Sequence, residues 1–327
     1  MMMEFLYKKI FQKILFKIDP EDAHNLAILF LKIISNLDIN FSKGVDDPFE
    51  FMGIRFKNRI GIAAGFDKNA EVFRAIGNLG FGFIEVGSVT LKPQKGNPKP
   101  RLFRIIDERS IINRFGLNNC GAVEFLRNIE RYDKKNIVLG INIAKNNDVD
   151  FKDSHKNIAE CYRILKDGGD FFVINLSCPN VERFEGDIYE YSKRILTEIK
   201  SISDKKPIFL KISPDLTDVD IKKVVDVCVE FNVGIVATNT SRRRDIIKNE
   251  HFRRIEGGLS GMCIKELSLD TLRKIRSYSN NIPVISVGGI FDRSDIEERK
   301  KLGVSLFEIY TSFIFEGPSI LEKLYKD

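Results

Sequence analysis

The sequence contains few cysteines, and none of them are paired at the short spacing of a metal site. The five residues Cys120, Cys161, Cys178, Cys228 and Cys263 are odd in number and far apart in a chain of 327 residues. Zinc and iron–sulfur sites usually carry C-x-x-C pairs, so no metal site is expected. Isolated cysteines are typical of a cytosolic chain whose thiols stay reduced.

Long apolar runs and concentrated charge are also lacking. No run reaches the roughly 18 residues of a membrane-spanning helix. A secretory signal is not expected, because Lys8, Lys9, Lys13 and Lys17 interrupt the apolar N-terminus. The 52 basic and 46 acidic residues give a net charge of +6. Because lysine and arginine are scattered along the chain, a nucleic-acid partner is not indicated.

Two helices are expected at the N-terminus. An apolar stripe at helical spacing predicts a helix over residues 4–18, and Asp19-Pro20 has the residue types of an N-cap and a first helical position. The second helix, over residues 20–36, is apolar on more than one face. Residues 1–40 therefore form either a cap on the core or a hairpin that lies on a membrane surface.

The remainder, residues 41–327, alternates apolar runs with amphipathic stretches. Eight runs are predicted strands, at 60–64, 83–89, 137–144, 171–176, 208–212, 234–238, 283–287 and 306–310. Amphipathic helices are predicted at 70–79, 155–165, 188–202, 219–230 and 267–277, and a short hairpin at 51–58 is expected to close the floor. This α/β pattern over roughly 250 residues predicts a (β/α)8 TIM barrel with a small N-terminal helical extension. A doubly wound open sheet is the alternative, because it shows the same alternation.

The loop after the fourth strand carries a group of reactive and hydrogen-bonding side chains. Asn175 and Asn180 flank Cys178 where Pro179 ends the strand. In a parallel barrel this is the end at which chemistry takes place. Two amides can bind a planar ligand, and a thiolate between them can accept a proton. The alternative is an ordinary loop with a half-buried cysteine and two turn asparagines.

Strands five to eight also end in features that suggest a ligand. Lys211 lies inside an apolar strand, and because a buried unpaired ammonium is costly, a ligand anion is a candidate partner. Glycine-rich segments at 257–261 and 287–290, with Gly317-Pro318 after the last strand, occur where this fold binds phosphate. An FMN phosphate there would place the isoalloxazine ring over the barrel mouth.

Ordered motifs along nearly the whole chain resemble the dihydroorotate dehydrogenase family, and most closely its membrane-associated, quinone-reducing class 2. They include AAGFDKN at 63–69, PRLFR at 100–104, INRFGLNN at 112–119, LGINI at 139–143, ATNT at 237–240 and GGLSG at 257–261. The resemblance implies an FMN enzyme that oxidises (S)-dihydroorotate to orotate in pyrimidine biosynthesis. It also implies a quinone as final acceptor and peripheral attachment to the cytoplasmic face of the cell membrane.

The resemblance also implies roles for individual residues. Cys178 is the implied catalytic base. The implied flavin contacts are Ala64, Gly65, Ser88, Asn142, Asn175, Lys211, Thr238, Gly261, Gly289, Tyr310 and Thr311. The implied substrate contacts are Lys68, Asn113, Arg114, Phe115, Gly116, Leu117, Asn175, Asn180, Asn239 and Thr240. His24 and Arg104 are the implied quinone contacts.

One departure bears on the electron acceptor. Class 2 enzymes have a serine where this chain has Cys178, and cysteine is the base of the soluble class 1 enzymes. Residues 181–184 also lack the Thr-Pro-Gly-Leu of class 2. The N-terminal helices, His24 and Arg104 favour the quinone. The alternatives are a soluble acceptor, either fumarate or NAD through a partner subunit, and a flavin-free barrel that acts as a binding module.

Overall fold

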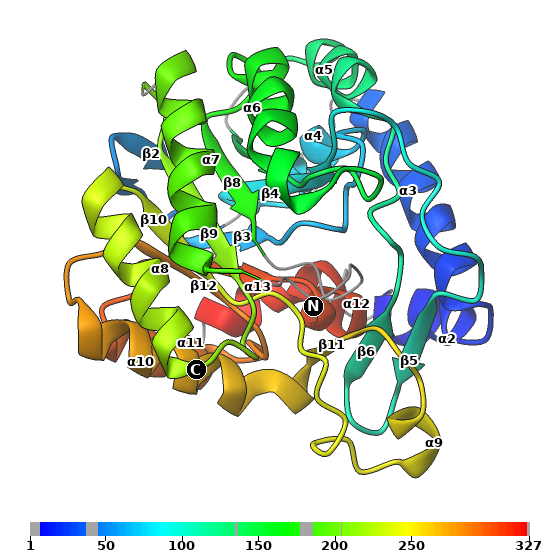
Figure 1. The fold of residues 1–327 in the computed structure, drawn as a ribbon. Coiled ribbons are helices and arrows are strands. Elements are labelled where there is room, and N and C mark those ends of the chain that lie inside the picture. Colours follow the sequence, from blue (N-terminus) through cyan, green and yellow to red (C-terminus); the bar gives the residue numbers. More distant parts are fainter. Residues whose placement is uncertain (1–6, 37–44, 135–136, 177–185, 204, 326–327) are drawn as a thin grey trace.

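The computed structural model describes residues 7–36, 45–134, 137–176, 186–203 and 205–325 (Figure 1). Eight parallel strands close into a barrel in the order β10-β12-β13-β3-β4-β7-β8-β9. They are β3 (Ile60–Ile62), β4 (Phe83–Val89), β7 (Val138–Ile143), β8 (Phe171–Asn175), β9 (Ile208–Ile212), β10 (Gly234–Ala237), β12 (Val284–Val287) and β13 (Leu306–Ile309). The predicted TIM barrel is therefore confirmed, and the open sheet is excluded.

Helices cover the outside of the barrel (Figure 1). They are α4 (Phe73–Asn78), α5 (Ala122–Glu130), α6 (Ser154–Leu165), α7 (Ile188–Ile202), α8 (Asp218–Phe231), α10 (Lys265–Tyr278), α11 (Arg293–Lys301), α12 (Thr311–Glu316) and α13 (Ile320–Tyr325). The short α9 (Glu250–Arg253) lies apart from these, near β5 and β6. Helix α7 illustrates why they form. The Asp187 carboxylate accepts the Tyr189 backbone N–H at 2.8 Å as an N-cap, and Ile188, Ile195 and Ile199 bury one face of the helix.

The floor of the barrel is closed by the predicted hairpin, which pairs β1 (Phe49–Phe51) with β2 (Ile54–Phe56). Its two-residue turn places Met52 and Gly53 at φ of 51° and 76°, as a tight hairpin turn requires. The ring of Phe56 meets that of Phe83 edge-on at 5.5 Å between centroids, inside the barrel. Because phenylalanine rings fill the lower barrel, the space for a ligand lies at the carboxyl ends of the strands.

A second sheet, which the sequence analysis did not predict, packs beside the barrel mouth. It is antiparallel in the order β11-β6-β5 and contains β5 (Leu102–Ile105), β6 (Ser110–Asn113) and β11 (Gly258–Gly261). The glycine-rich segment at 257–261 was interpreted as a loop, and most of it is strand β11. Leu102, Ile111 and Ser260 of this sheet line the main cavity described below.

The N-terminal segment forms a π-helical turn η1 (Tyr7–Phe11), α2 (Gln12–Leu15) and α3 (Pro20–Asn36). The Asp19 carboxylate caps α3 by accepting the Glu21 N–H at 2.8 Å. Figure 1 shows α3 along one side of the barrel, near α4 and the strands β5 and β6. Within the described residues, no helix is both long and apolar enough to cross a membrane.

Candidate active site

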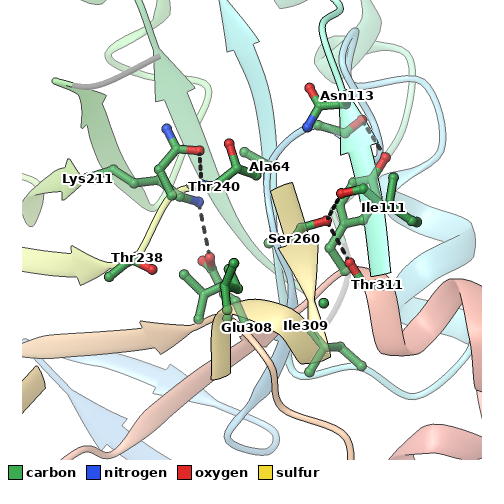
Figure 2. Close-up of a pocket in the computed structure, with 18 of the residues that line it drawn as sticks. Ala64, Ile111, Asn113, Lys211, Thr238, Thr240, Ser260, Glu308, Ile309 and Thr311 are labelled. Atoms are coloured by element: carbon green, nitrogen blue, oxygen red, sulfur yellow. Dashed lines mark hydrogen bonds and ion pairs between the residues drawn. The ribbon is translucent and has the colours of Figure 1, made fainter. Parts of the chain in front are cut away.

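The carboxyl ends of the barrel strands surround a cavity of about 1140 Å³, which includes the space at its opening (Figure 2). We call it the polar cavity. Most of the residues predicted for flavin and substrate line it: Ala64, Gly65, Lys68, Ser88, Asn113, Phe115, Leu117, Asn142, Asn175, Lys211, Thr238, Asn239, Thr240, Gly261, Gly289, Tyr310 and Thr311. These residues are spread from position 64 to position 311, so the fold collects the predicted site in one place.

Four predicted residues are not seen in this lining. Arg114 directs its guanidinium to the Pro100 carbonyl oxygen, with donor distances of 3.1 and 2.9 Å. The Gly116 carbonyl oxygen accepts the Asn147 side-chain amide at 3.1 Å. Cys178 and Asn180 lie outside the described residues. The described chain before them ends at Leu176, and Asn175, the last residue of β8, lines the cavity.

Lys211 has carboxylate partners within the protein, so the ligand anion that was a candidate partner is not required. Its ammonium nitrogen lies 2.6 Å from a carboxylate oxygen of Glu85 and 3.4 Å from one of Glu308 (Figure 2 shows the second contact). Asn142 donates its amide N–H to the other oxygen of Glu85. Both glutamates are fully buried inside apolar strands. A single acidic residue inside each of these runs was the signal that the sequence analysis overlooked.

Several buried oxygens at the polar cavity have no hydrogen-bond partner within the described part of the chain. They are Asn118 Oδ1, Asn142 Oδ1, Thr238 Oγ1 and Glu308 Oε1, and all four residues line the cavity. Buried polar atoms are normally satisfied, so these indicate a polar ligand with several donors and acceptors. A flavin ring, with its imide and ring nitrogens, fits this requirement.

Amide side chains connect the ends of alternate barrel strands, β10 to β8 and β8 to β4, along another part of the wall. Asn239 donates to Asn175 Oδ1 at 3.2 Å, and Asn175 donates to Ser88 Oγ at 3.2 Å. The Thr240 backbone N–H donates to Asn239 Oδ1 at 2.9 Å. These contacts orient the amides, which present both donors and acceptors to a planar ligand.

The opposite end of the cavity contains hydroxyl groups and glycines. Ser260 Oγ and Thr311 Oγ1 lie 2.9 Å apart (Figure 2), beside Gly261 and Gly289. At Gly289, φ is +69° and an added Cβ would lie 2.5 Å from the Lys265 Cα. A side chain is thus excluded by the packing of the chain itself, and the bare backbone stays accessible at this end.

Arg299 is a supporting residue that the sequence analysis missed. Its fully buried guanidinium donates to the Gly288 carbonyl oxygen at 2.6 Å and to Ser268 Oγ at 3.0 Å. It therefore fixes the turn that carries Gly289. Nothing in the highly charged helix α11 distinguishes Arg299 from its exposed neighbours at the level of sequence.

Lys68 links the polar cavity to the N-terminal segment. Its ammonium nitrogen lies 3.5 Å from His24 Nε2 and 4.2 Å from the centroid of the Phe115 ring. Burial, with the Arg101 charge adding to it and Glu21 opposing it, lowers the pKa of Lys68 to about 8. Burial and then the charge of Lys68 hold the pKa of His24 well below its usual value. At neutral pH, Lys68 is thus charged and His24 is neutral.

A second cavity, here called the apolar cavity, lies between the N-terminal helices and the barrel and has a volume of about 1780 Å³, which includes the space at its opening. Its walls include Phe16, Phe30 and Leu31, together with both predicted quinone residues, His24 and Arg104. Arg104 donates to the carbonyl oxygen of Leu15 at 2.8 Å and also to that of Ile18. Leu102, Ile111 and Tyr310 line both cavities.

The outer face of the N-terminal helices is apolar and exposed. Ile14, Leu29 and Ile33 are more than half exposed, at 57%, 57% and 54%. They do not line the apolar cavity, whereas Phe11, Leu26 and Phe30 line it and are about half exposed as well. Apolar side chains gathered in this way around an opening mark an interaction surface.

Comparisons with known proteins agree with this geometry. The family model described as Dihydroorotate dehydrogenase matches residues 48–327. A relative from Teredinibacter turnerae, named dihydroorotate dehydrogenase (quinone), is 38% identical over 326 residues, covering 95% of this chain and 96% of the relative. A relative of the same name from Marinomonas sp. is 37% identical, with coverages of 95% and 94%.

Solved structures are similar as well. The ligand-free Eimeria tenella DHODH superposes with a TM-score of 0.86 at 32% identity, covering 94% of this chain and 93% of that one. The same protein in complex with ferulenol gives a TM-score of 0.86 at 31% identity, with coverages of 94% and 89%.

Proposed function

The chain belongs to the dihydroorotate dehydrogenase family, and from this premise we propose that it oxidises (S)-dihydroorotate to orotate in pyrimidine biosynthesis and passes the electrons to a quinone. The observation that carries the proposal is the pair of adjoining cavities. One is polar and lined by amides and two lysines, the other is apolar and open at the N-terminal helices, and they share the wall of Leu102, Ile111 and Tyr310. Such a pair serves a polar substrate and an apolar acceptor that exchange electrons through a group between them.

The family is flavin-dependent, and we propose FMN as the flavin. The residues that would hold its ring include Ala64, Ser88, Asn142, Lys211 and Thr238, whose unpartnered oxygens and buried cation suit the polar ring edge. Gly261, Gly289 and Thr311, with Ser260, would receive the phosphate, and Gly65 and Tyr310 would contact the ring. When bound, the flavin supplies the hydride acceptor.

The substrate would lie between the flavin and the amide wall. Lys68 matches the carboxylate of orotate, and Asn113, Asn175 and Asn239 match the donors and acceptors of its ring. Asn180 and Thr240 complete this set in the proposal. Cys178 follows Asn175 by three residues, and we assign it the removal of a proton from C5 of dihydroorotate.

The ionisation of Lys68 predicts how orotate binding depends on pH. Only the ammonium form attracts the carboxylate, so the dissociation constant of orotate should be constant below the lysine pKa of about 8 and rise about tenfold per pH unit above it. A Lys68→Met variant should bind orotate weakly and show no such rise. Calorimetric titration of the holoenzyme with orotate on both sides of pH 8 measures this. If the orotate dissociation constant of the wild type does not change with pH, Lys68 does not bind the carboxylate of orotate.

The apolar cavity is the proposed quinone site. His24 and Arg104 are polar groups in a mostly apolar lining, and in this proposal they hydrogen-bond the quinone oxygens. The exposed Ile14, Leu29 and Ile33 would rest on the membrane surface from which a quinone enters. We accordingly propose a peripheral position on the cytoplasmic face of the membrane.

Deleting the residues before Phe41 is expected to abolish quinone reduction while flavin remains bound. The deletion removes one whole side of the apolar cavity but leaves most of the lining of the polar cavity in place. Steady-state turnover with decylubiquinone and the flavin content of the purified variant measure the two effects.

A matched control for this deletion is the double variant Leu29→Glu/Ile33→Glu. These side chains are exposed and do not line the apolar cavity. The double variant should therefore lose binding to lipid vesicles but keep turnover with a quinone supplied in detergent. Full quinone turnover by the deleted enzyme would show that the cavity is not the quinone site.

Cys178 supports a second candidate, the same oxidation with a soluble acceptor such as fumarate or NAD. Cysteine at this position is the class 1 feature noted in the sequence. A soluble acceptor would leave the apolar cavity without a ligand, and we therefore favour the quinone as acceptor. Both candidates share FMN and the oxidation of dihydroorotate, and this shared chemistry can be tested directly. The purified protein should contain FMN, and anaerobic dihydroorotate should bleach its visible absorbance. A colourless protein would favour the other alternative, a flavin-free barrel that acts as a binding module.

A further inference from the structure

Three charged side chains meet inside the barrel, and their charges do not balance. Lys211 from β9 lies between Glu85 from β4 and Glu308 from β13, with side-chain exposures of 6%, 0% and 0%. If all three were ionised, the cluster would carry one net negative charge away from water. An unbalanced buried charge is costly, and one additional proton on a carboxyl group removes it.

The contacts indicate which carboxyl group takes the proton. Glu85 receives the Lys211 ammonium at 2.6 Å and the Asn142 amide on its other oxygen, so its negative charge is well satisfied. Glu308 has only the longer ammonium contact, at 3.4 Å. Glu308, whose negative charge would be less well satisfied, is therefore the group that we expect to take the proton.

The ionisation behaviour agrees with this assignment. Burial opposes ionisation of Glu85, but the Lys211 charge and the hydrogen bonds outweigh it and lower the pKa of Glu85. Burial and then the charge of Glu85 raise the pKa of Glu308 well above its usual value. Despite burial, the two glutamates raise the pKa of Lys211. The charged groups that act most strongly on Glu308 are Glu85 and Lys211, and its neighbours in register on the adjacent strands, Val287 and Gly61, carry no charge.

One oxygen of Glu308 is left for a ligand. Glu308 Oε1 is buried and has no hydrogen-bond partner within the described residues, and Glu308 lines the same polar cavity as Asn142 and Thr238, which also carry unpartnered oxygens. Figure 2 shows Glu308 pointing into the region between Lys211 and Ile309. A carboxylic acid at this place neutralises the cluster and still offers a hydrogen-bonding oxygen to the cavity.

We propose that Glu308 is held as a neutral carboxylic acid at physiological pH and that its free oxygen is a hydrogen-bonding contact for the ligand of the polar cavity, which is FMN if the proposed function holds. In this arrangement Glu85 alone is the counterion of Lys211. Because Glu308 is neutral, its contact with the ligand keeps a negative charge away from the flavin. Loss of its proton would weaken flavin binding and make the bound flavin harder to reduce.

The protonation of the Glu308 carboxyl group is tested by infrared spectroscopy, which needs neither enzyme activity nor bound flavin. At neutral pH the wild type should show a carboxylic acid C=O band that shifts in D₂O and is absent from Glu308→Gln. The same band should also disappear in Glu85→Gln, because Glu308 then becomes the counterion of Lys211 and ionises. This second comparison stands even if Glu308→Gln does not fold. Absence of the band in the wild type, or its persistence in Glu85→Gln, would overturn the proposal.

The contact with the ligand is tested by FMN affinity of the apoprotein. Glu308→Gln keeps a neutral group of the same shape, so the FMN dissociation constant should stay within about threefold of the wild type. Glu308→Leu removes the hydrogen bond and should raise that constant about tenfold. If Glu308→Gln weakens FMN binding as much as Glu308→Leu, an ionised Glu308 is required and the proposal is wrong. If the wild type binds no FMN while the infrared band is present, the proposed function fails and the neutral acid stands.

Discussion

Substituting alanine for Cys178 is expected to slow reduction of the flavin by dihydroorotate about 10²–10⁴-fold, the usual contribution of a general base. A thiol has an ordinary pKa of about 8.5, so a thiolate base is accessible near neutral pH. The asparagines at the amide wall can bind the substrate but cannot act as bases. Because Lys68 and these asparagines remain, orotate should bind the variant almost as tightly as the wild type.

The pH dependence distinguishes a base from a residue that only contributes to packing. Stopped-flow bleaching should rise with pH in the wild type until the thiolate is fully formed and then level off. Cys178→Ser should retain more activity than Cys178→Ala, with its pH dependence displaced upward. If the alanine variant bleaches as fast as the wild type, Cys178 is not the base.

Replacing Lys211 with methionine is expected to destabilise the fold by about 3–5 kcal/mol and to release the flavin. The substitution removes the cation between two fully buried carboxyl groups and leaves Glu85 with only the Asn142 amide. Breaking a buried ion pair by removing one partner has this magnitude. Urea unfolding at neutral pH, with flavin fluorescence as a second signal, measures both effects.

The pH dependence of this destabilisation has a definite sign. In the wild type the lowered pKa of Glu85 contributes stability that is present above the unfolded-state pKa and is lost as pH falls. In Lys211→Met burial raises that pKa instead, so the stability deficit should shrink as the pH is lowered from about 8 to about 5. Lys222→Met removes an exposed lysine paired with Asp226 and should leave stability almost unchanged. Equal stability of the Lys211 variant and the control would contradict the account.

The sequence predicted the barrel well where burial alone determines the strands. The run 208–212 coincides with β9 and 83–89 with β4, because a strand covered on both faces is continuously apolar between polar ends. The run 60–64 is longer than β3, which ends at Ile62. Strands β5, β6 and β11 were missed because each mixes polar with apolar residues in only four positions, unlike the apolar barrel strands, and β11 is half glycine.

The residues of the site could be predicted from the sequence, but the contacts between them could not. Lys211 was singled out because a charge in an apolar strand is unusual, yet its partner Glu85 is 126 positions away and only the closure of the barrel brings them together. The contact between Lys68 and His24 likewise joins residues 44 positions apart. Without the resemblance, nothing at the level of sequence distinguishes His24 and Arg104 from ordinary helix and strand residues.

The most direct test of the central claim is a comparison of electron acceptors. Purified full-length protein is given dihydroorotate and, in separate reactions, decylubiquinone, fumarate or NAD, and orotate formation is followed by its absorbance. The two adjoining cavities predict rapid multiple turnover with the quinone and almost none with fumarate or NAD. Turnover with fumarate or NAD and none with the quinone would contradict the account and assign the chain to soluble-acceptor chemistry.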